Sequence, residues 1–220
     1  MREDIEKADV FIRHGDFEKP KWPTYSNFQR LFTDKTLHLT EKGKKEIKDS
    51  IIKIPNIQSI DLILSSPYQR TQESAQVVQE CIKEFFRSKV SIITTELLKE
   101  IEVQPDILSR KEFYGLIVRN LGRLEPLKES LFDKWRFGKA KEGPIEVESR
   151  IKNLLNEIAR FHREGKKKIL LISHASFGRA LKRFLSGQEI TLPRNEDRTV
   201  RKAGIFYILP TTTESFNPLE

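Results

Sequence analysis

Three short, largely apolar runs constrain this chain most, because each is followed at once by polar side chains and then by a helical pattern. The runs cover residues 9–12, 60–64 and 168–172. Such runs suit strands that are covered on both faces, as in a parallel sheet. Strands that alternate with helices predict an α/β sandwich, in which a mainly parallel sheet lies between two helical layers.

The rest of the secondary structure follows from periodicity and from turn residues. Two further strands are predicted at 90–94 and 203–209, and helices are predicted from Glu41 to just before Pro55 and at 68–86, 145–161 and 175–185. Thr40 is the expected N-cap of the first helix, and Pro67 fits the first turn of the second. Cys81 lies on the apolar stripe of that second helix, so we predict a core residue and not a nucleophile.

The length of the chain, 220 residues, fits one α/β domain spanning residues 1–220. Residues 103–144 lack strand patterning and predict a helical insertion that caps a pocket. Residues 15–34 form a long loop with two prolines, and loops of this length are often functional. Residues 210–220 are expected to form a loose tail.

Composition excludes several classes of protein. No stretch approaches the roughly 18 consecutive apolar residues that a membrane span needs, and the charged first nine residues do not form a signal peptide. A single cysteine rules out an internal disulfide framework. We therefore expect a cytoplasmic protein without membrane association.

The net charge of +8 suits an anionic ligand. The lysines are interleaved with acidic residues, except in the run 166–168, and they read as solvated surfaces. No zinc-finger spacing or RNA-recognition motif is present. We therefore predict no nucleic-acid partner.

Polar residues that suit an anion pocket follow the three apolar runs. Arg13 and His14 end the first run, Arg70 follows the second within a few residues, and His174 follows the third. Ligand sites of open α/β sheets gather at the carboxyl ends of the strands. Arginine holds phosphoryl oxygens with two parallel hydrogen bonds, and neutral histidine is a competent nucleophile.

Five motifs in order resemble the histidine phosphatase superfamily, also called the phosphoglycerate mutase-like family. They are Arg13-His14-Gly15, Leu39-Thr40-Glu41-Lys42-Gly43, the segment from Ser65 to Thr71, Leu98-Lys99-Glu100-Ile101, and Ser173-His174. The resemblance covers most of the chain. It implies a mixed sheet with one antiparallel strand, which periodicity alone does not predict.

The resemblance also implies the role of each site residue. His14 is the nucleophile that forms a phosphohistidine, Arg13 and Arg70 bind the phosphoryl group, and His174 binds and stabilises it during transfer. Glu100 is the proton donor. Glu96 and Glu102 remain alternatives for that role, because the Gly-Trp-Glu-Gly-like continuation of the family is absent after Glu100.

Within the family, the chain is predicted to be a metal-independent phosphomonoester hydrolase with no cofactor. The mutase signatures after Arg13-His14-Gly15 and after the acid are absent, which favours a phosphatase over a phosphoglycerate mutase-type phosphotransferase. A non-catalytic module that binds a phosphorylated ligand is a further alternative. Four scattered histidines give no metal-binding cluster. The substrate is expected to be a phosphorylated small molecule or a phosphoprotein, and the oligomeric state is left open.

Overall fold

The computed structural model describes residues 2–19, 34–101, 111, 114, 142–190 and 204–208. Their centre is a five-stranded sheet in the order β3-β2-β4-β1-β5. The strands are β1 (Asp9–Arg13), β2 (Leu62–Ser65), β3 (Ser91–Thr94), β4 (Ile169–Ser173) and β5 (Ile205–Ile208). The first four strands are parallel to their neighbours, and β5 runs antiparallel to β1. The expected mixed sheet with one antiparallel strand is therefore confirmed.

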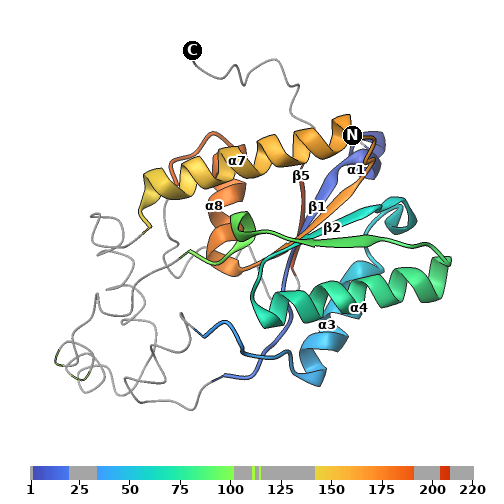
Figure 1. Cartoon of the computed structure of the whole chain (residues 1–220), viewed down its shortest axis with the longest axis horizontal. Coiled ribbons are helices and arrows are strands. Elements are labelled where there is room, and N and C mark those ends of the chain that lie inside the picture. The colour runs from blue at the N-terminus through green and yellow to red at the C-terminus, as the bar shows by residue number, and fades with distance from the viewer. Residues whose placement is uncertain are drawn as a thin grey trace.

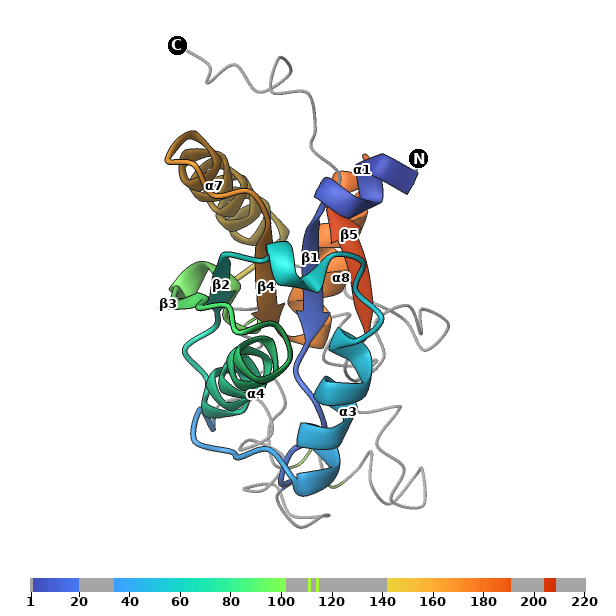
Figure 2. The ribbon, with the colours of Figure 1, turned by 90° about the vertical axis from the view of Figure 1, so that its right-hand side faces the viewer.

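Helices cover both faces of this sheet (Figures 1 and 2). The longer helices are α3 (Glu41–Ile51), α4 (Gln69–Phe86), α7 (Pro144–Arg163) and α8 (Ala175–Leu185), and the shorter ones are α1 (Arg2–Lys7) and the 3₁₀ helices η1 (Ile57–Ser59) and η2 (Glu96–Leu98). Periodicity predicted the four long helices, whereas the three short helices were not predicted. In the part of the chain that the structure describes, no helix is long and apolar enough to cross a membrane.

The two sides of the sheet carry two separate hydrophobic cores, because successive side chains of a strand point to opposite faces. Phe11 and Leu171 pack with α7 and α8 on one face. Val10 and Ile172 pack with α3 and α4 on the other. Cys81 is buried in this second core, as its position on the helical stripe predicted.

Local signals in the sequence explain where the helices begin and end. The Thr40 hydroxyl accepts a hydrogen bond of 3.0 Å from the Gly43 amide at the start of α3. Gly165 follows α7 with a φ of +94° that favours glycine. Pro67 lies just before α4 and not in its first turn, since the helix begins at Gln69.

Two motif glycines allow two backbone segments to approach each other beside the site. A Cβ on Gly15 would lie 2.2 Å from the carbonyl oxygen of Gly43, and a Cβ on Gly43 would lie 2.0 Å from that of Asp16. Both contacts are with backbone, which has little room to move. The start of α3 is thereby held against the segment that follows β1.

One prediction about surface charge is wrong. Lys168 belongs to the lysine run that was expected to be solvated, yet its side chain is buried. Its ammonium donates hydrogen bonds to the carbonyl oxygens of Glu6 at 3.0 Å and Pro55 at 2.7 Å. One lysine of the run after α7 is therefore buried at the amino end of the sheet.

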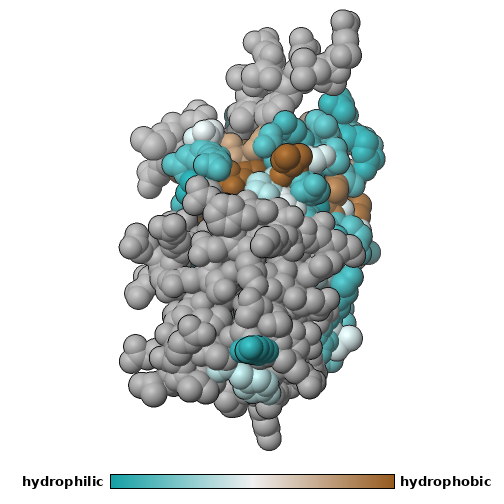
Figure 3. All heavy atoms as spheres, turned by 90° about the vertical axis from the view of Figure 1, so that its left-hand side faces the viewer, coloured by the Kyte–Doolittle hydropathy of each residue, from teal (hydrophilic) through white to brown (hydrophobic). Residues whose placement is uncertain are grey.

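The remaining organisational predictions lie mostly outside the described residues. These are the helical insertion at 103–144, most of the loop at 15–34 and the tail at 210–220. The single-domain organisation of residues 1–220 therefore stays a prediction. On the face shown in Figure 3, the described residues present small hydrophobic areas broken up by hydrophilic ones.

Candidate active site

The candidate site lies at the carboxyl edge of the three central strands. Arg13 at the end of β1 pairs in register with Ser173 at the end of β4. The next backbone contacts continue this edge, because the His14 amide donates to the Ser173 carbonyl at 3.0 Å and the Ser66 amide donates to the Ile172 carbonyl at 3.1 Å. His14, Ser66 and His174 are thus the first residues beyond three neighbouring strands.

His14 is buried, and its hydrogen bonds fix its tautomer. Its Nδ1 lies 2.8 Å from the carbonyl oxygen of Gly15. A carbonyl only accepts, so Nδ1 carries the hydrogen. The Arg70 Nε–H lies 3.3 Å from the other ring nitrogen, Nε2, and donates to its lone pair. The Nε2 atom of His14 is therefore the nucleophilic end of a neutral imidazole.

His174 is fully buried, and its ring centroid lies 5.2 Å from that of His14. Its Nδ1 accepts from Arg70 at 3.3 Å, so its Nε2–H donates to the Ser66 hydroxyl at 2.8 Å. Burial, followed by the positive charge of the nearby Arg70, holds the pKa of His174 well below its ordinary value. His174 is therefore neutral.

Arg70 is the second residue of α4, and its guanidinium is buried next to two aromatic rings. It lies 4.9 Å from the ring centroid of Phe17 and 4.8 Å from that of Tyr68. Its hydrogen bonds go to the two histidines and to the Asp34 carbonyl, at 3.3 Å each. Among the described residues, no carboxylate forms an ion pair with it. Burial lowers the pKa of Arg70, and the charge of Glu100 acts in the opposite direction.

Arg13 adds a second cation to the same edge. Burial lowers its pKa, the charge of Glu100 raises it, and the charges of Arg179 and Arg70 lower it. Glu100 thus acts on the charges of both Arg13 and Arg70, and Arg179 acts on that of Arg13. Arg179 on α8 was not predicted, although it lies only five residues after His174 in the sequence.

Glu100 joins this group from the segment after η2. Its Oε1 accepts hydrogen bonds of 3.0 Å from the amides of Ile101 and Phe177, and its Oε2 accepts from the Ser176 amide at 3.4 Å. The carboxylate therefore lies at the amino terminus of α8, where the helix dipole favours negative charge.

Of the two alternatives to Glu100 as proton donor, Glu96 and Glu102, the structure describes only Glu96. Glu96 is exposed at the start of η2. Its charge is not among the causes of the pKa shifts of Arg13 and Arg70. Glu102 lies outside the described residues.

Three residues of the site carry contacts that sequence reasoning did not assign. Ser66 accepts from His174, and Phe17 and Tyr68 hold the Arg70 guanidinium between them. Ser66 and Tyr68 lie inside the motif that contains Arg70, so their position in the motif was the available signal. Phe17 lies three residues after His14, in a stretch that carried no pattern.

The loop at 15–34 and the insertion at 103–144 carry aromatic residues that could pack against a ligand, although packing in the core or the cap is their expected role. Tyr114 is about half exposed. Trp22, Tyr25, Phe113 and Trp135 lie outside the described residues. Within the described ranges, no group of three or more His, Cys, Asp or Glu side chains has the arrangement of a metal site.

Fold and site together have the chemistry that suits an enzyme acting on phosphoryl groups, because a neutral histidine lies next to buried arginine side chains. The sequence profile of the histidine phosphatase superfamily (branch 1) matches residues 10–208. Because this match covers most of the chain, the protein belongs to that superfamily. Membership supports a phosphatase that hydrolyses phosphomonoesters.

Solved structures share this fold at low sequence identity. A mycobacterial glucosyl-3-phosphoglycerate phosphatase is 15% identical with a TM-score of 0.55, and 84% of this chain and 81% of that chain are covered. A mutant phosphoserine phosphatase from Entamoeba histolytica, in complex with phosphoserine, is 18% identical with a TM-score of 0.55, over 92% and 94% of the two chains.

The alpha-ribazole phosphatase of Shigella flexneri is 17% identical with a TM-score of 0.53, and the match covers 81% of this chain and 79% of that one. At these identities the likeness establishes the shared fold. No curated protein sequence matches the chain.

Proposed function

We propose that this protein is a metal-independent phosphomonoester hydrolase that works through a phosphohistidine at Nε2 of His14. The observation that carries the proposal is the hydrogen bonding of His14. Its Nδ1–H donates to the Gly15 carbonyl, and its Nε2 lone pair lies next to Arg70. The nucleophile is thus neutral, oriented and adjacent to a fixed cation.

The first half of the reaction transfers the phosphoryl group to the enzyme. The Nε2 lone pair of His14 attacks phosphorus, the bond from phosphorus to the ester oxygen breaks, and Glu100 gives its proton to the departing alkoxide. Arg13 and Arg70 bind the equatorial oxygens, which requires the Arg70 Nε–H to leave the His14 lone pair for a phosphoryl oxygen. His174 stabilises the charge on the transferring group, which requires its Nε2–H to leave the Ser66 hydroxyl for a phosphoryl oxygen.

The second half regenerates the enzyme. A water molecule attacks the phosphohistidine, gives its proton to Glu100 and displaces the His14 nitrogen from phosphorus. Inorganic phosphate leaves, and Glu100 is ready to act as an acid again. One carboxyl group can act as acid and then as base, because the first half-reaction requires a proton for the alkoxide and the second removes a proton from water.

We further propose a phosphorylated small molecule of the cytoplasm as the substrate. The structural neighbours named above are phosphatases of glucosyl-3-phosphoglycerate, phosphoserine and alpha-ribazole phosphate. Their substrates share a phosphomonoester on a small polar molecule. A panel of such esters, with a phosphopeptide included, ranks the candidates by kcat/KM.

The decisive experiment traps the covalent intermediate. The protein is mixed briefly with an aryl phosphate carrying labelled phosphate, and the reaction is quenched with alkali, since phosphohistidine is acid-labile. The label should be found on His14, should be absent in His14→Ala, and should form in the presence of a chelator. Wild-type turnover by His14→Ala, or loss of turnover with the chelator, would contradict the proposal.

The role of Glu100 is tested by changing the leaving group. Glu100→Gln should slow the cleavage of an alkyl phosphate by about 10²–10⁴-fold. Cleavage of an activated aryl phosphate should fall much less, because a good leaving group needs little protonation. Equal losses on both esters would assign the proton transfer to another carboxylate.

A further inference from the structure

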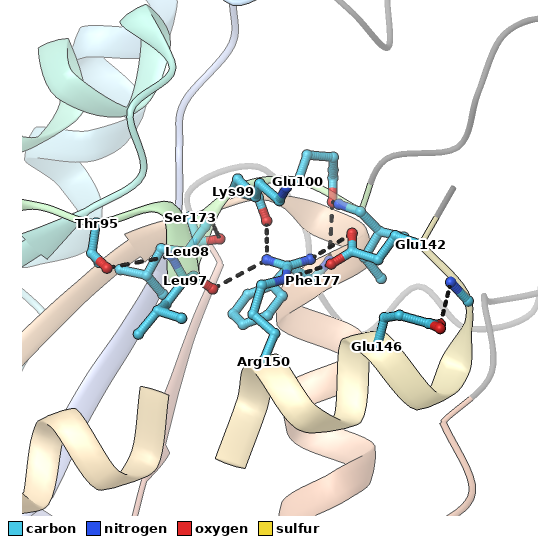
Figure 4. A network of polar contacts seen from close by, with 12 residues as sticks. Thr95, Leu97, Leu98, Lys99, Glu100, Glu142, Glu146, Arg150, Ser173 and Phe177 are labelled. Atoms are coloured by element: carbon cyan, nitrogen blue, oxygen red, sulfur yellow. Dashed lines mark hydrogen bonds and ion pairs between the residues drawn. The ribbon is translucent and has the colours of Figure 1, made fainter. Parts of the chain in front are cut away.

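A buried ion pair contacts the backbone segment that leads to Glu100. Arg150 on α7 is paired with Glu142, which lies just before that helix (Figure 4). The Nε atom of Arg150 is 2.6 Å from Oε1 of Glu142, and its Nη2 atom is 2.9 Å from Oε2. Both side chains are about nine-tenths buried. This is a two-pronged pair of the kind that fixes a guanidinium in one orientation.

The third nitrogen of the same guanidinium holds the backbone that leads to Glu100. The Nη1 atom of Arg150 donates to the carbonyl oxygens of Leu97 at 3.1 Å and Lys99 at 2.7 Å. The intervening carbonyl, that of Leu98, accepts from the Ser173 hydroxyl at 2.5 Å. Three successive carbonyls are therefore held by side chains from two other elements.

A second path connects Arg150 to the carboxylate itself. The guanidinium carbon lies 4.5 Å from the ring centroid of Phe177. The amide of the same residue, Phe177, donates to Glu100. Arg150 thus contacts both the residue before Glu100 and the residue whose amide orients the Glu100 carboxylate.

We propose that Arg150, held by Glu142, is a positioning residue for Glu100 in the phosphatase reaction. It acts by fixing the segment of residues 97–99 and the ring of Phe177, without contact with the substrate. This inference rests on the proposed function, in which Glu100 transfers the proton. The contacts that connect this pair to Glu100 are the hydrogen bonds to the carbonyls of Leu97 and Lys99 and the packing on the Phe177 ring.

The variants are chosen to separate positioning from folding. Arg150→Met alone would take the guanidinium away from the buried Glu142 carboxylate, so the main variant removes both members of the pair by combining Arg150→Met with Glu142→Leu. The matched control is Arg160→Met on the same helix. Arg160 also contacts an aromatic ring, that of Phe161 at 4.4 Å, and a carboxylate, that of Glu164 at 2.7 Å, but it is exposed.

The first readout is the dependence on the leaving group. The double variant should lose about 10²-fold in kcat on an alkyl phosphate, the cost of a small misplacement of a catalytic group. The loss on an aryl phosphate should be much smaller, and KM should change little. Added to Glu100→Gln, the double substitution should cause little further loss, because its effect acts through Glu100. Equal losses on both esters, or losses that multiply with Glu100→Gln, would overturn the proposal.

The second readout does not depend on activity. Amide hydrogen exchange of Ile101 and Phe177 should be at least about tenfold faster in the double variant, whereas the amides of Gly43 and Thr71 on the opposite side of the sheet should not change. Arg160→Met should alter neither readout. Unchanged exchange at Ile101 and Phe177 would refute the positioning role. A wild-type protein inactive on both esters would refute the proposed function instead, and exchange would still decide the role of Arg150.

Discussion

Two histidines at opposite ends of the sheet show how neighbouring charge decides what a histidine can do. His174, at the carboxyl edge, is buried beside Arg70, and its pKa is well below the ordinary value. His162, near the amino edge, lies 2.8 Å from Asp9, whose other oxygen accepts from the Ile169 amide. Burial opposes charge on His162, but the hydrogen bonds to Asp9 and to the Lys166 carbonyl outweigh it and raise its pKa.

The same contrast separates the buried cations of the two edges. Lys168 at the amino edge donates its hydrogen bonds to two carbonyl oxygens. Burial lowers its pKa, and the negative charges of Asp9 and Glu6 raise it. Arg70 at the carboxyl edge gives its hydrogen bonds to two neutral rings and one carbonyl. Among the described residues, the cation at the amino edge is therefore balanced by nearby carboxylates, whereas Arg70 forms no ion pair, as the proposed binding of a phosphoryl group requires.

The largest expected difference between the edges is in catalysis. His174→Gln should lower kcat for an aryl phosphate by about 10²–10³-fold, because a donor to the transferring group is lost. His162→Gln should leave kcat close to that of the wild type. Steady-state kinetics of both variants checks this, and comparable losses in the two would remove the functional distinction between the edges.

The next difference is in stability. Lys168→Met should lower the free energy of unfolding by about 1–3 kcal/mol, because two carbonyl oxygens lose their donor, and it should leave kcat unchanged. Arg70→Met should show the reverse, with phosphatase activity lost and stability kept, since it removes a buried charge that has no carboxylate in direct contact within the described part of the chain. Urea unfolding with parallel assays measures both. An Arg70→Met protein as destabilised as Lys168→Met would make Arg70 a structural residue.

The smallest effect is the dependence of stability on pH, and its sign is opposite for the two histidines. The folded pKa of His174 lies below 6.5, so its contribution is present above pH 6.5 and is lost as the pH falls toward the folded pKa. The folded pKa of His162 lies above 6.5, so its contribution is present below pH 6.5 and is lost as the pH rises through the folded pKa.

Thermal unfolding between about pH 5 and pH 9 tests both signs. The His174→Gln protein should lose less stability than the wild type on the acidic side, and the His162→Gln protein should lose less on the alkaline side. The His162 effect should be weak and should shrink with added salt, because this side chain is about one-third exposed. The raised pKa of Asp9, caused mainly by burial, acts at lower pH. Slopes of the same sign would contradict the assigned environments.

Much of the framework was predictable because its signals are local. Apolar runs predicted all five strands. Four of the predictions lie within about two residues of the observed bounds, and the run at 203–209 contains the fifth strand. Thr40 predicted the start of α3, and the pattern around Cys81 predicted the buried face of α4. The rule that ligand sites gather at the carboxyl ends of parallel strands brought His14, Arg70 and His174 to one edge.

The sequence by itself determined the strand and helix order and which residue types meet at the carboxyl edge, because periodicity and motifs are written in consecutive residues. Only the tertiary structure decided how these side chains are held. The Nε2 lone pair of His14 depends on Gly15 and Arg70, the neutrality of His174 depends on burial beside Arg70, and Lys168 is buried by carbonyls from distant segments. Protonation and orientation arise from neighbours far apart in the chain, and no local pattern encodes which neighbours those are.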